Sequence, residues 1–260
     1  MWASCDCTTW SGPASGRGAL NTLAVIPARY ASERLPGKPL ARIGEATLVE
    51  RVYTTAAACR HFDAVVVATD DERVADCVRA FGGAVEMTRS DHHSGTDRVA
   101  EVAERHPESA VVVNVQGDQP FVSAEQLTAL LGPYLAGETP QMTTLACPLS
   151  EALDADDPGV VTVVRDRRGR ALYFSRSPIP HGDGPRLHHL GLYAFRREAL
   201  KEYTALTETE LEVRERLEQL RALEHGFEII VCLTDEAVLE VNTPADLERA
   251  RLAVAGAPTR

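Results

Sequence analysis

Three cationic side chains stand close together in an otherwise acidic chain, just after its first apolar run. Arg29, Arg34 and Lys38 lie within residues 27–40, a segment that also holds Gly and several Pro residues. Backbone amides of a glycine-bearing loop, together with Arg and Lys, form a binding site for phosphate groups. The segment lacks the G-x-x-x-x-G-K-[ST] pattern of a Walker A loop. Spacing alone therefore leaves a solvated surface loop as an equal alternative.

A second candidate is the carboxylate of Asp118, which follows a strongly β-branched run at residues 110–115. A carboxylate at a strand end, on the same sheet edge as the cationic loop, suits a Mg2+ ion that bridges phosphate oxygens. An ordinary turn Asp is the alternative. The expected proximity of the two strand ends favours the metal site.

The segment around residues 92–98 is a further candidate for ligand binding. Ser94 and Gly95 open a predicted helix and could hold a nucleobase, although a plain helix N-cap has the same composition. His92 and His93 have no third ligand at a spacing typical of metal sites. We interpret the two histidines as surface loop residues.

Alternating apolar runs and helical periodicities position these residues in the first half of the chain. The alternation predicts a parallel sheet with helices on both faces, and such sheets bind ligands at the carboxyl ends of their strands. The predicted strands are residues 23–26, 64–68, 84–87 and 110–115. The predicted helices are residues 47–59, 72–81 and 96–105.

The second half of the chain has a different pattern, with strands joined by a predicted hairpin turn at residues 166–169. The predicted strands are residues 142–148, 160–165, 171–175, 187–195 and 228–233. The predicted helices are residues 208–224 and 244–255, the latter with Thr243 as its N-cap. We predict one domain over residues 21–260 with an inserted antiparallel section. Residues 1–20 are interpreted as a loose extension, because they lack the features of a signal peptide.

Composition restricts the possible partners. Of the 260 residues, 44% are hydrophobic, which is enough for a sizeable core, and the formal net charge of −11 argues against a nucleic-acid partner. No apolar run is long enough to span a bilayer, so we expect a cytoplasmic protein without a membrane partner. The C-x-x-C pattern does not occur, and the cysteines are interpreted as reduced, mostly buried thiols.

Taken together, residues 23 to about 253 resemble the 3-deoxy-manno-octulosonate (Kdo) cytidylyltransferase family, also called CMP-Kdo synthetases. So many blocks in the same order are far more specific than any single motif. The matching blocks are residues 26–40, 67–70, 87–89, 94–98, 113–118, 171–176, 189–193 and 217–221. The resemblance implies a three-layer, Rossmann-like nucleotidyltransferase fold with a mostly parallel sheet, and a homodimer.

The resemblance also implies roles for individual residues. Arg29, Arg34 and Lys38 would hold the phosphates of CTP, and Asp118 would bind Mg2+. Positions around the nucleotide would be Ala28, Arg89, Ser94, Gly95 and Gln116. The acceptor pocket would be formed by Arg176, His189, Tyr193, Glu218 and Gln219. An acceptor oxygen would then attack the α-phosphorus of CTP in line, and pyrophosphate would leave.

The chain departs from the family pattern in three places. Gln119 stands where the family usually has Glu, and Asn242 stands where it has an Asp that is a second metal ligand. Asn242 could still offer a neutral carbonyl oxygen to the metal. The stretch between Pro180 and His189 is also shorter than the usual connection.

Two lost carboxylates suggest that negative charge comes from the acceptor instead. We therefore favour phosphonoformate, a compact and highly charged acceptor of phosphonate antibiotic pathways, as the hypothesis for the substrate. The alternatives are Kdo itself in a drifted CMP-Kdo synthetase, a related sugar acid such as an amino-Kdo, and a CTP-binding protein without catalytic activity. The Arg, Lys and Asp set argues against the last of these.

Overall fold

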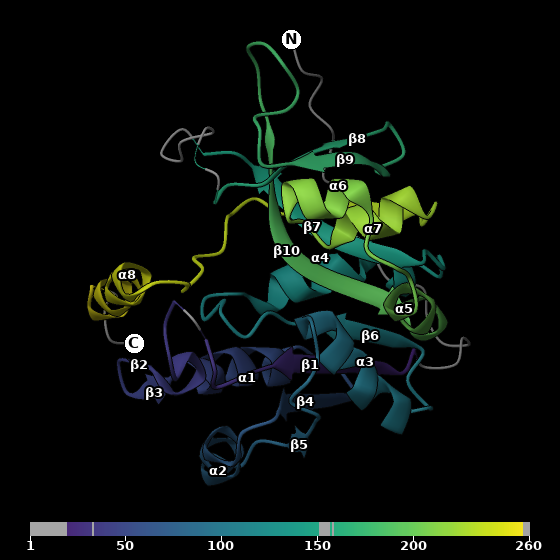
Figure 1. Cartoon of the computed structure of the whole chain (residues 1–260). Coiled ribbons are helices and arrows are strands. Elements are labelled where there is room, and N and C mark those ends of the chain that lie inside the picture. The colour runs from purple at the N-terminus through teal and green to yellow at the C-terminus, as the bar shows by residue number, and fades with distance from the viewer. Residues whose placement is uncertain (1–19, 33, 151–156, 158, 257–260) are drawn as a thin grey trace.

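A nine-stranded sheet forms the centre of the molecule (Figure 1). The computed structural model describes residues 20–32, 34–150, 157 and 159–256. The predicted N-terminal extension therefore lies, except for Leu20, outside the described residues. No helix in the described part of the chain has the length and apolarity needed to cross a membrane.

Parallel strands make up most of the central sheet. Along its main path the strand order is β11-β7-β10-β6-β1-β4-β5, and β10 is the one strand on this path that runs opposite to its neighbours. These strands are β1 (Thr22–Pro27), β4 (Ala64–Thr69), β5 (Val85–Met87), β6 (Val111–Asn114), β7 (Met142–Pro148), β10 (Leu187–Arg196) and β11 (Ile229–Leu233). The mostly parallel sheet is confirmed.

An antiparallel ribbon extends from β10. It consists of β8 (Thr162–Arg165) and β9 (Ala171–Ser175), and β8 pairs with both β9 and β10. The two strands are joined at Gly169, whose φ of 83° is a left-handed conformation that glycine adopts without strain. The inserted antiparallel section and its hairpin turn agree with the prediction.

Helices cover both faces of the sheet. They are α1 (Leu48–Ala58), α2 (Glu72–Ala80), α3 (Gly95–Arg105), α4 (Ala124–Leu135), α5 (Arg197–Thr204), α6 (Glu210–Glu215), α7 (Gln219–Glu224) and α8 (Pro244–Ala255). A short 3-10 helix η1 (Lys38–Leu40) and the small strands β2 (Arg42–Ile43) and β3 (Ala46–Thr47) follow β1. Ser or Thr capping boxes open α1, α3, α4 and α8, which explains why these helices start where they do.

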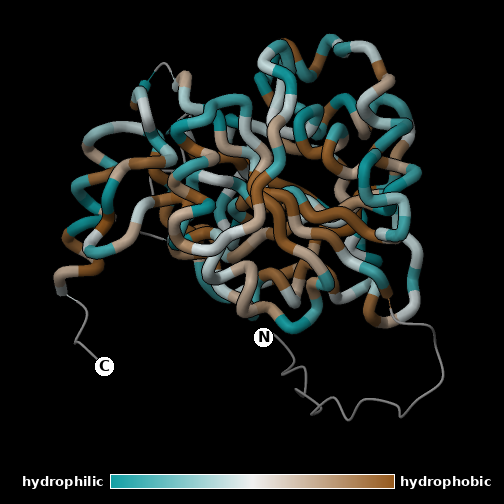
Figure 2. Tube along the Cα trace, turned by 90° about the horizontal axis from the view of Figure 1, so that it is seen from below, coloured by the Kyte–Doolittle hydropathy of each residue, from teal (hydrophilic) through white to brown (hydrophobic). Residues whose placement is uncertain are grey.

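The three layers follow from the alternation of side chains along the strands. In β1, Ala24 and Ile26 belong to the apolar core under α1 and α4, whereas Leu23 and Val25 belong to the core under α3 and α5. The hydrophobic segments of the chain gather in the middle of the molecule, and more hydrophilic segments lie around them (Figure 2). A strand buried on both faces reads as an unbroken apolar run, as expected for a parallel sheet between helices.

Two predictions about helices need correction. Residues 208–224 do not form one helix, because Arg216 adopts a left-handed conformation with φ 55° and separates α6 from α7. The leucine periodicity across the break arises because both short helices bury their apolar sides against the same core. No helix was predicted for residues 124–135, where α4 continues through Pro133.

Helix α4 provides a test of the core. Leu130→Ala should lower the free energy of unfolding by about 3 kcal/mol, because Leu130 is fully buried and the substitution leaves a cavity. Leu252→Ala on α8 is the matched control: Leu252 is 71% exposed, so we expect a change below about 0.5 kcal/mol. Denaturant unfolding measures both. Similar losses for the two variants would contradict the placement of α4.

Candidate active site

The cationic loop after β1 is closed by its own backbone. The carbonyl oxygen of Tyr30 accepts hydrogen bonds from the N–H groups of Ser32 and Gly37, both at 3.0 Å. Gly37 has φ 70°, and a Cβ there would lie 3.3 Å from the Tyr30 ring. Glycine is therefore required on steric grounds, and the turn delivers Lys38 to the start of η1.

The loop after β6 lies directly against this turn. A Cβ on Gly117 would come within 2.6 Å of the carbonyl oxygen of Pro27, a distance that real Cβ atoms do not adopt. Only glycine allows so close an approach of the two chain segments. The contact brings Asp118 next to the cationic loop, as the parallel arrangement of β1 and β6 predicts.

Lys38 connects three segments of the chain. Its ammonium Nζ lies 2.8 Å from Asp118 Oδ2 and 3.1 Å from Asn242 Oδ1. Arg34 Nη2 also donates to Asn242 Oδ1, at 3.2 Å. The Asp118 carbonyl oxygen accepts the N–H of Val241 at 2.8 Å, which aligns the segment before α8. The structure thus brings together the residues predicted for phosphate and metal binding.

A pocket of about 410 Å³ opens at this edge of the sheet. The predicted residues among those that line it are Ala28, Arg29, Arg34, Lys38, Ser94, Gly95, Gln116, Asp118 and Asn242. Arg29 and Arg34 are exposed, so their guanidinium groups are accessible to an anionic ligand. The N–H of Ala28 already donates to the carbonyl oxygen of Ala68, so this residue shapes the pocket without offering a free donor.

Ser94 and Gly95 form the wall opposite the cationic loop. Ser94 Oγ accepts the N–H of Asp97, and the Asp97 carboxylate accepts the N–H of Ser94, so the pair is an N-cap as well as a pocket wall. A Cβ on Gly95 would lie 3.4 Å from the ring of Pro27. On the adjoining wall, Gln116 Nε2 donates to the carbonyl oxygen of Gly191 on β10.

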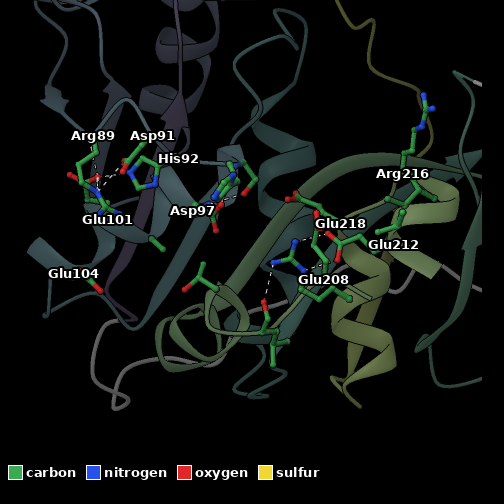
Figure 3. Close-up of a pocket in the computed structure, with 18 of the residues that line it drawn as sticks. Arg89, Asp91, His92, Asp97, Glu101, Glu104, Glu208, Glu212, Arg216 and Glu218 are labelled. Atoms are coloured by element: carbon green, nitrogen blue, oxygen red, sulfur yellow. Dashed lines mark hydrogen bonds and ion pairs between the residues drawn. The ribbon is translucent and has the colours of Figure 1, made fainter. Parts of the chain in front are cut away.

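Arg89 lies apart from the smaller pocket, in a second hollow of about 1480 Å³ between the α3 side and the α6–α7 side of the molecule (Figure 3). Its Nε lies 3.6 Å from Glu101 Oε2. The surface interpretation of His92 was wrong: its side chain is only 4% exposed, because Nε2 pairs with the Glu101 carboxylate that reaches back from α3. His92, His93 and Ser94 line both hollows.

Three residues predicted for the acceptor form one buried, uncharged group. Tyr193 Oη donates to Gln219 Oε1 at 2.9 Å, and the His189 ring lies 5.6 Å from the Tyr193 ring. Burial, reinforced by His188, lowers the pKa of His189 to about 3, so the imidazole is neutral at physiological pH. Thr144 Oγ1 donates to the Leu192 carbonyl, so we assign the His189 hydrogen to Nε2, which lies 2.8 Å from that hydroxyl oxygen.

Gln219 carries an unused donor. Its Nε2 is buried and has no hydrogen-bond partner, although the residue is only 1% exposed. A buried amide without a partner is costly unless a ligand or water completes it. Gln219 lines neither of the two hollows, so this donor lies inside the protein, next to the Tyr193 hydroxyl.

Glu218 and Arg176 sit at the junction of α6 and α7. Burial raises the pKa of Glu218 to about 7, although the hydroxyl of Thr96 donates to its carboxylate at 2.9 Å. Arg176 Nε donates to the backbone carbonyl of Glu215 at 2.8 Å, and its own N–H donates to the Glu215 carboxylate. The helix break at Arg216 thus positions both predicted acceptor residues.

Glu240 is a residue that the motif analysis missed. Gln119 Nε2 donates to its Oε1 at 3.1 Å, and Asn242 Nδ2 donates to its Oε2 at 3.0 Å. Desolvation, followed by the negative charge of Asp118, raises the pKa of the Glu240 carboxyl. The available signal was its position two residues before Asn242, in a segment that had already departed from the family pattern.

The donor set fits a hard cation. Among the described residues there is no group of three or more His, Cys, Asp or Glu side chains that could hold a metal alone, so phosphate and water oxygens must complete its coordination. Asp118 Oδ2 and Asn242 Oδ1 already converge on a cation, the Lys38 ammonium. Asp118 Oδ2 and Asn242 Oδ1 are therefore the two protein oxygens at this point that are placed to face a cation.

Comparison with known proteins agrees with this geometry. A family model described as Cytidylyltransferase matches residues 23–236, so the fold and site define a CTP-dependent nucleotidyltransferase. The 3-deoxy-manno-octulosonate cytidylyltransferase of Acaryochloris marina is 56% identical over 237 residues, covering 90% of this chain and 97% of that protein. The protein of the same name in Synechococcus elongatus is 54% identical, and the match covers 88% of this chain and 96% of that protein.

A solved structure gives the same result. It is described as CMP:2-keto-3-deoxy-manno-octonic acid synthetase complexed with CTP, with a TM-score of 0.85 and 42% identity over 90% of this chain and 98% of that one. The chain therefore belongs to the 3-deoxy-manno-octulosonate cytidylyltransferase family. The interpretation as a CTP-binding protein without activity is not retained.

The preference for phosphonoformate as acceptor was wrong. Relatives that are more than half identical over nearly their whole length are named for Kdo. The charge argument failed because it counted carboxylates only at Gln119 and Asn242 and overlooked Glu240, which contacts both. The acceptor residues His189 and Gln219 are also uncharged, which does not suit a small, highly charged ligand.

The raised pKa of Glu218 predicts a pH dependence of stability. The ordinary pKa of Glu is 4.5, so ionisation at a folded-state pKa of about 7 opposes folding, and stability is lost as pH rises from about 4.5 to about 7. Glu218→Gln removes this cost. The change in the free energy of unfolding that it causes should therefore be more favourable at pH 8 than at pH 4.5, by on the order of 2 kcal/mol. Unfolding at both pH values measures the difference.

The exposed Glu208, in the same hollow, is the control for this experiment. Glu208→Gln should change stability equally at both pH values. If Glu218→Gln behaves in the same way as the control, the assignment of Glu218 as a buried, easily protonated carboxyl is refuted.

Proposed function

We propose that this enzyme transfers CMP from CTP to Kdo and releases pyrophosphate, in the cytoplasm, where CTP is made. The observation that supports Kdo is the group of uncharged hydrogen-bonding side chains on β10 and α7, and the β10 backbone is bonded to Gln116 of the cationic pocket. His189 is neutral, Tyr193 is fully engaged with Gln219, and the Gln219 amide has a donor to spare. Hydroxyl groups of a sugar acid pair with such side chains without burying further charge.

The cationic loop would bind the triphosphate. Arg29 and Arg34 are exposed at the pocket mouth, and Lys38 lies deeper, against Asp118. Arg and Lys neutralise the charge that develops on the phosphate oxygens when pyrophosphate leaves. The three cations therefore position the nucleotide and stabilise the transition state.

We propose Mg2+ as the cofactor, held by Asp118 with the neutral oxygen of Asn242 nearby. Held by these two residues, the ion would supply positive charge that offsets the negative charge of the phosphate groups during attack at the α-phosphorus. The Lys38 ammonium lies between the two side chains. When the triphosphate binds, the Lys38 ammonium can turn from Asp118 to the phosphates.

The acceptor side would orient the attacking oxygen. The Gln219 amide and the neutral His189 are fixed by Tyr193 and Thr144, so they present hydrogen bonds in a constant direction. Arg176, tied to the α6 end, supplies a positive charge near this group for a carboxylate. Positioning of this kind accounts for catalysis without a covalent enzyme intermediate.

The test is pyrophosphate release from CTP, Mg2+ and Kdo by the purified protein. Wild type should release pyrophosphate and form CMP-Kdo, and phosphonoformate in place of Kdo should give no release. Asp118→Asn should reduce kcat by at least roughly 100-fold, because the metal carboxylate is lost. Asp76→Asn on the exposed face of α2 is the control and should retain activity. Absence of CMP-Kdo with folded wild-type protein would refute the proposal.

We also propose a homodimer formed through the antiparallel section. Leu172 on β9 and Val213 on α6 are large apolar side chains that are 61% and 60% exposed. Among the described strands β9 pairs only with β8, so one edge of it is free. Exposed apolar side chains beside an unpaired strand edge are features of association surfaces.

Sedimentation tests this dimer. The mass measured for the wild type should be twice that of one chain. Leu172→Glu should give the mass of a single chain, because dimerisation would bury the new charge in the interface. Leu252→Glu is the matched control, since Leu252 is 71% exposed on α8, outside the antiparallel section. A Leu172→Glu variant that remains dimeric, or a wild type that is monomeric, would rule out this interface.

A further inference from the structure

Gln119, Glu240 and Asn242 form one connected group beside Asp118. Both amide NH2 groups donate to the same carboxylate: Gln119 Nε2 to Glu240 Oε1 at 3.1 Å, and Asn242 Nδ2 to Glu240 Oε2 at 3.0 Å. Gln119 is fully buried and is held by a second bond to the carbonyl of Leu190 at 2.6 Å. The Glu240 carboxylate is therefore fixed in place by two donors.

The amides explain why a carboxylate is tolerated at position 240. A Glu at 119 or an Asp at 242 would put two negative oxygens at hydrogen-bond distance from each other, where like charges repel. With amides at both positions, the repulsion becomes attraction. The two departures from the family pattern, Gln119 and Asn242, thus accompany a carboxylate at position 240, two residues before Asn242.

The other side of Asn242 faces the metal site. Its Oδ1 accepts from Lys38 and Arg34, and Lys38 in turn contacts Asp118. Asn242 therefore links the Glu240 carboxylate to the oxygens that converge on the Lys38 ammonium. The cation position is bounded by one carboxylate at Asp118, an amide oxygen at Asn242 and the Glu240 carboxylate behind it.

We propose that Glu240 supplies the second carboxylate of the Mg2+ site, directly or through a metal-bound water, in place of the Asp that residue 242 has lost. This inference rests on the proposed Mg2+ dependence. It deepens the proposed function, since the total negative charge around the metal is then two, one from Asp118 and one from Glu240. Mg2+ prefers charged oxygens and commonly keeps waters between itself and part of the protein.

The test measures metal binding without turnover. Binding of Mn2+, as a paramagnetic probe for the Mg2+ site, is followed by electron paramagnetic resonance with CTP present and no acceptor. Glu240→Gln should weaken Mn2+ binding by roughly 10- to 100-fold, and Glu240→Asp by less. Glu236→Gln, an exposed carboxylate on the same segment, should bind Mn2+ as wild type does.

A second experiment places the carboxylate at position 242 instead of position 240. In the double variant Glu240→Gln/Asn242→Asp, the carboxylate returns to position 242, and Mn2+ affinity should recover most of the loss. The glutamine introduced at position 240 can donate to the aspartate introduced at position 242, so the contact between the two positions is kept with its direction reversed, and recovery of Mn2+ affinity reports the returned charge rather than a restored contact. Thermal unfolding of each variant confirms that the compared proteins are folded.

Two results would overturn the proposal: Mn2+ affinity of Glu240→Gln equal to that of wild type, or a double variant as weak as Glu240→Gln alone. Because no acceptor is present, neither result depends on whether Kdo is the substrate. If CMP-Kdo formation fails while the Mn2+ pattern holds, the acceptor assignment is wrong and the role of Glu240 stands.

Discussion

The site depends on one partly sheltered ion pair, Lys38 with Asp118, at 2.8 Å, whose side chains are 17% and 24% exposed. It joins the loop after β1 to the end of β6, and Asn242 adds the segment before α8. Removal of the Asp118 charge would leave the Lys38 ammonium with Asn242 Oδ1 as its remaining partner among the contacts described, and would loosen the link between the two loops. The ion pair also keeps the Lys38 ammonium in the pocket, beside the exposed Arg29 and Arg34, where the chain meets an anionic nucleotide.

Two kinds of architecture meet at this edge. The nucleotide side is built from the ends of parallel strands, where glycine allows main chains to touch, as at Gly117. The acceptor side is built on β10, the reversed strand, whose register shifts between His189 and Tyr193. Gln116 and Gln119 cross from one side to the other through bonds to the β10 backbone. Strand β10 and the side chains on it are therefore held in a constant position relative to the cationic loop.

The sequence predicted the sheet well because a parallel strand buried on both faces is an uninterrupted apolar run, as at residues 110–115. It failed where tertiary contacts decide. The spacing of leucines does not indicate that Arg216 adopts a left-handed conformation. The burial of His92 depends on its pairing with the Glu101 carboxylate of α3. The cationic loop stood out by its own residues, although their spacing alone left a surface loop as an equal alternative. Glu240 was not, because its role arises from two amides, one of them 121 residues away in the chain.

The two amides on Glu240 have a consequence for how substitutions in this part of the site combine. Gln119 and Asn242 both donate to the Glu240 carboxylate, so replacing either amide by an acid turns attraction into repulsion only while a carboxylate stands at position 240. The effects of changes at the three positions are therefore not additive, and the effect of a substitution at any one of them depends on the residues at the other two.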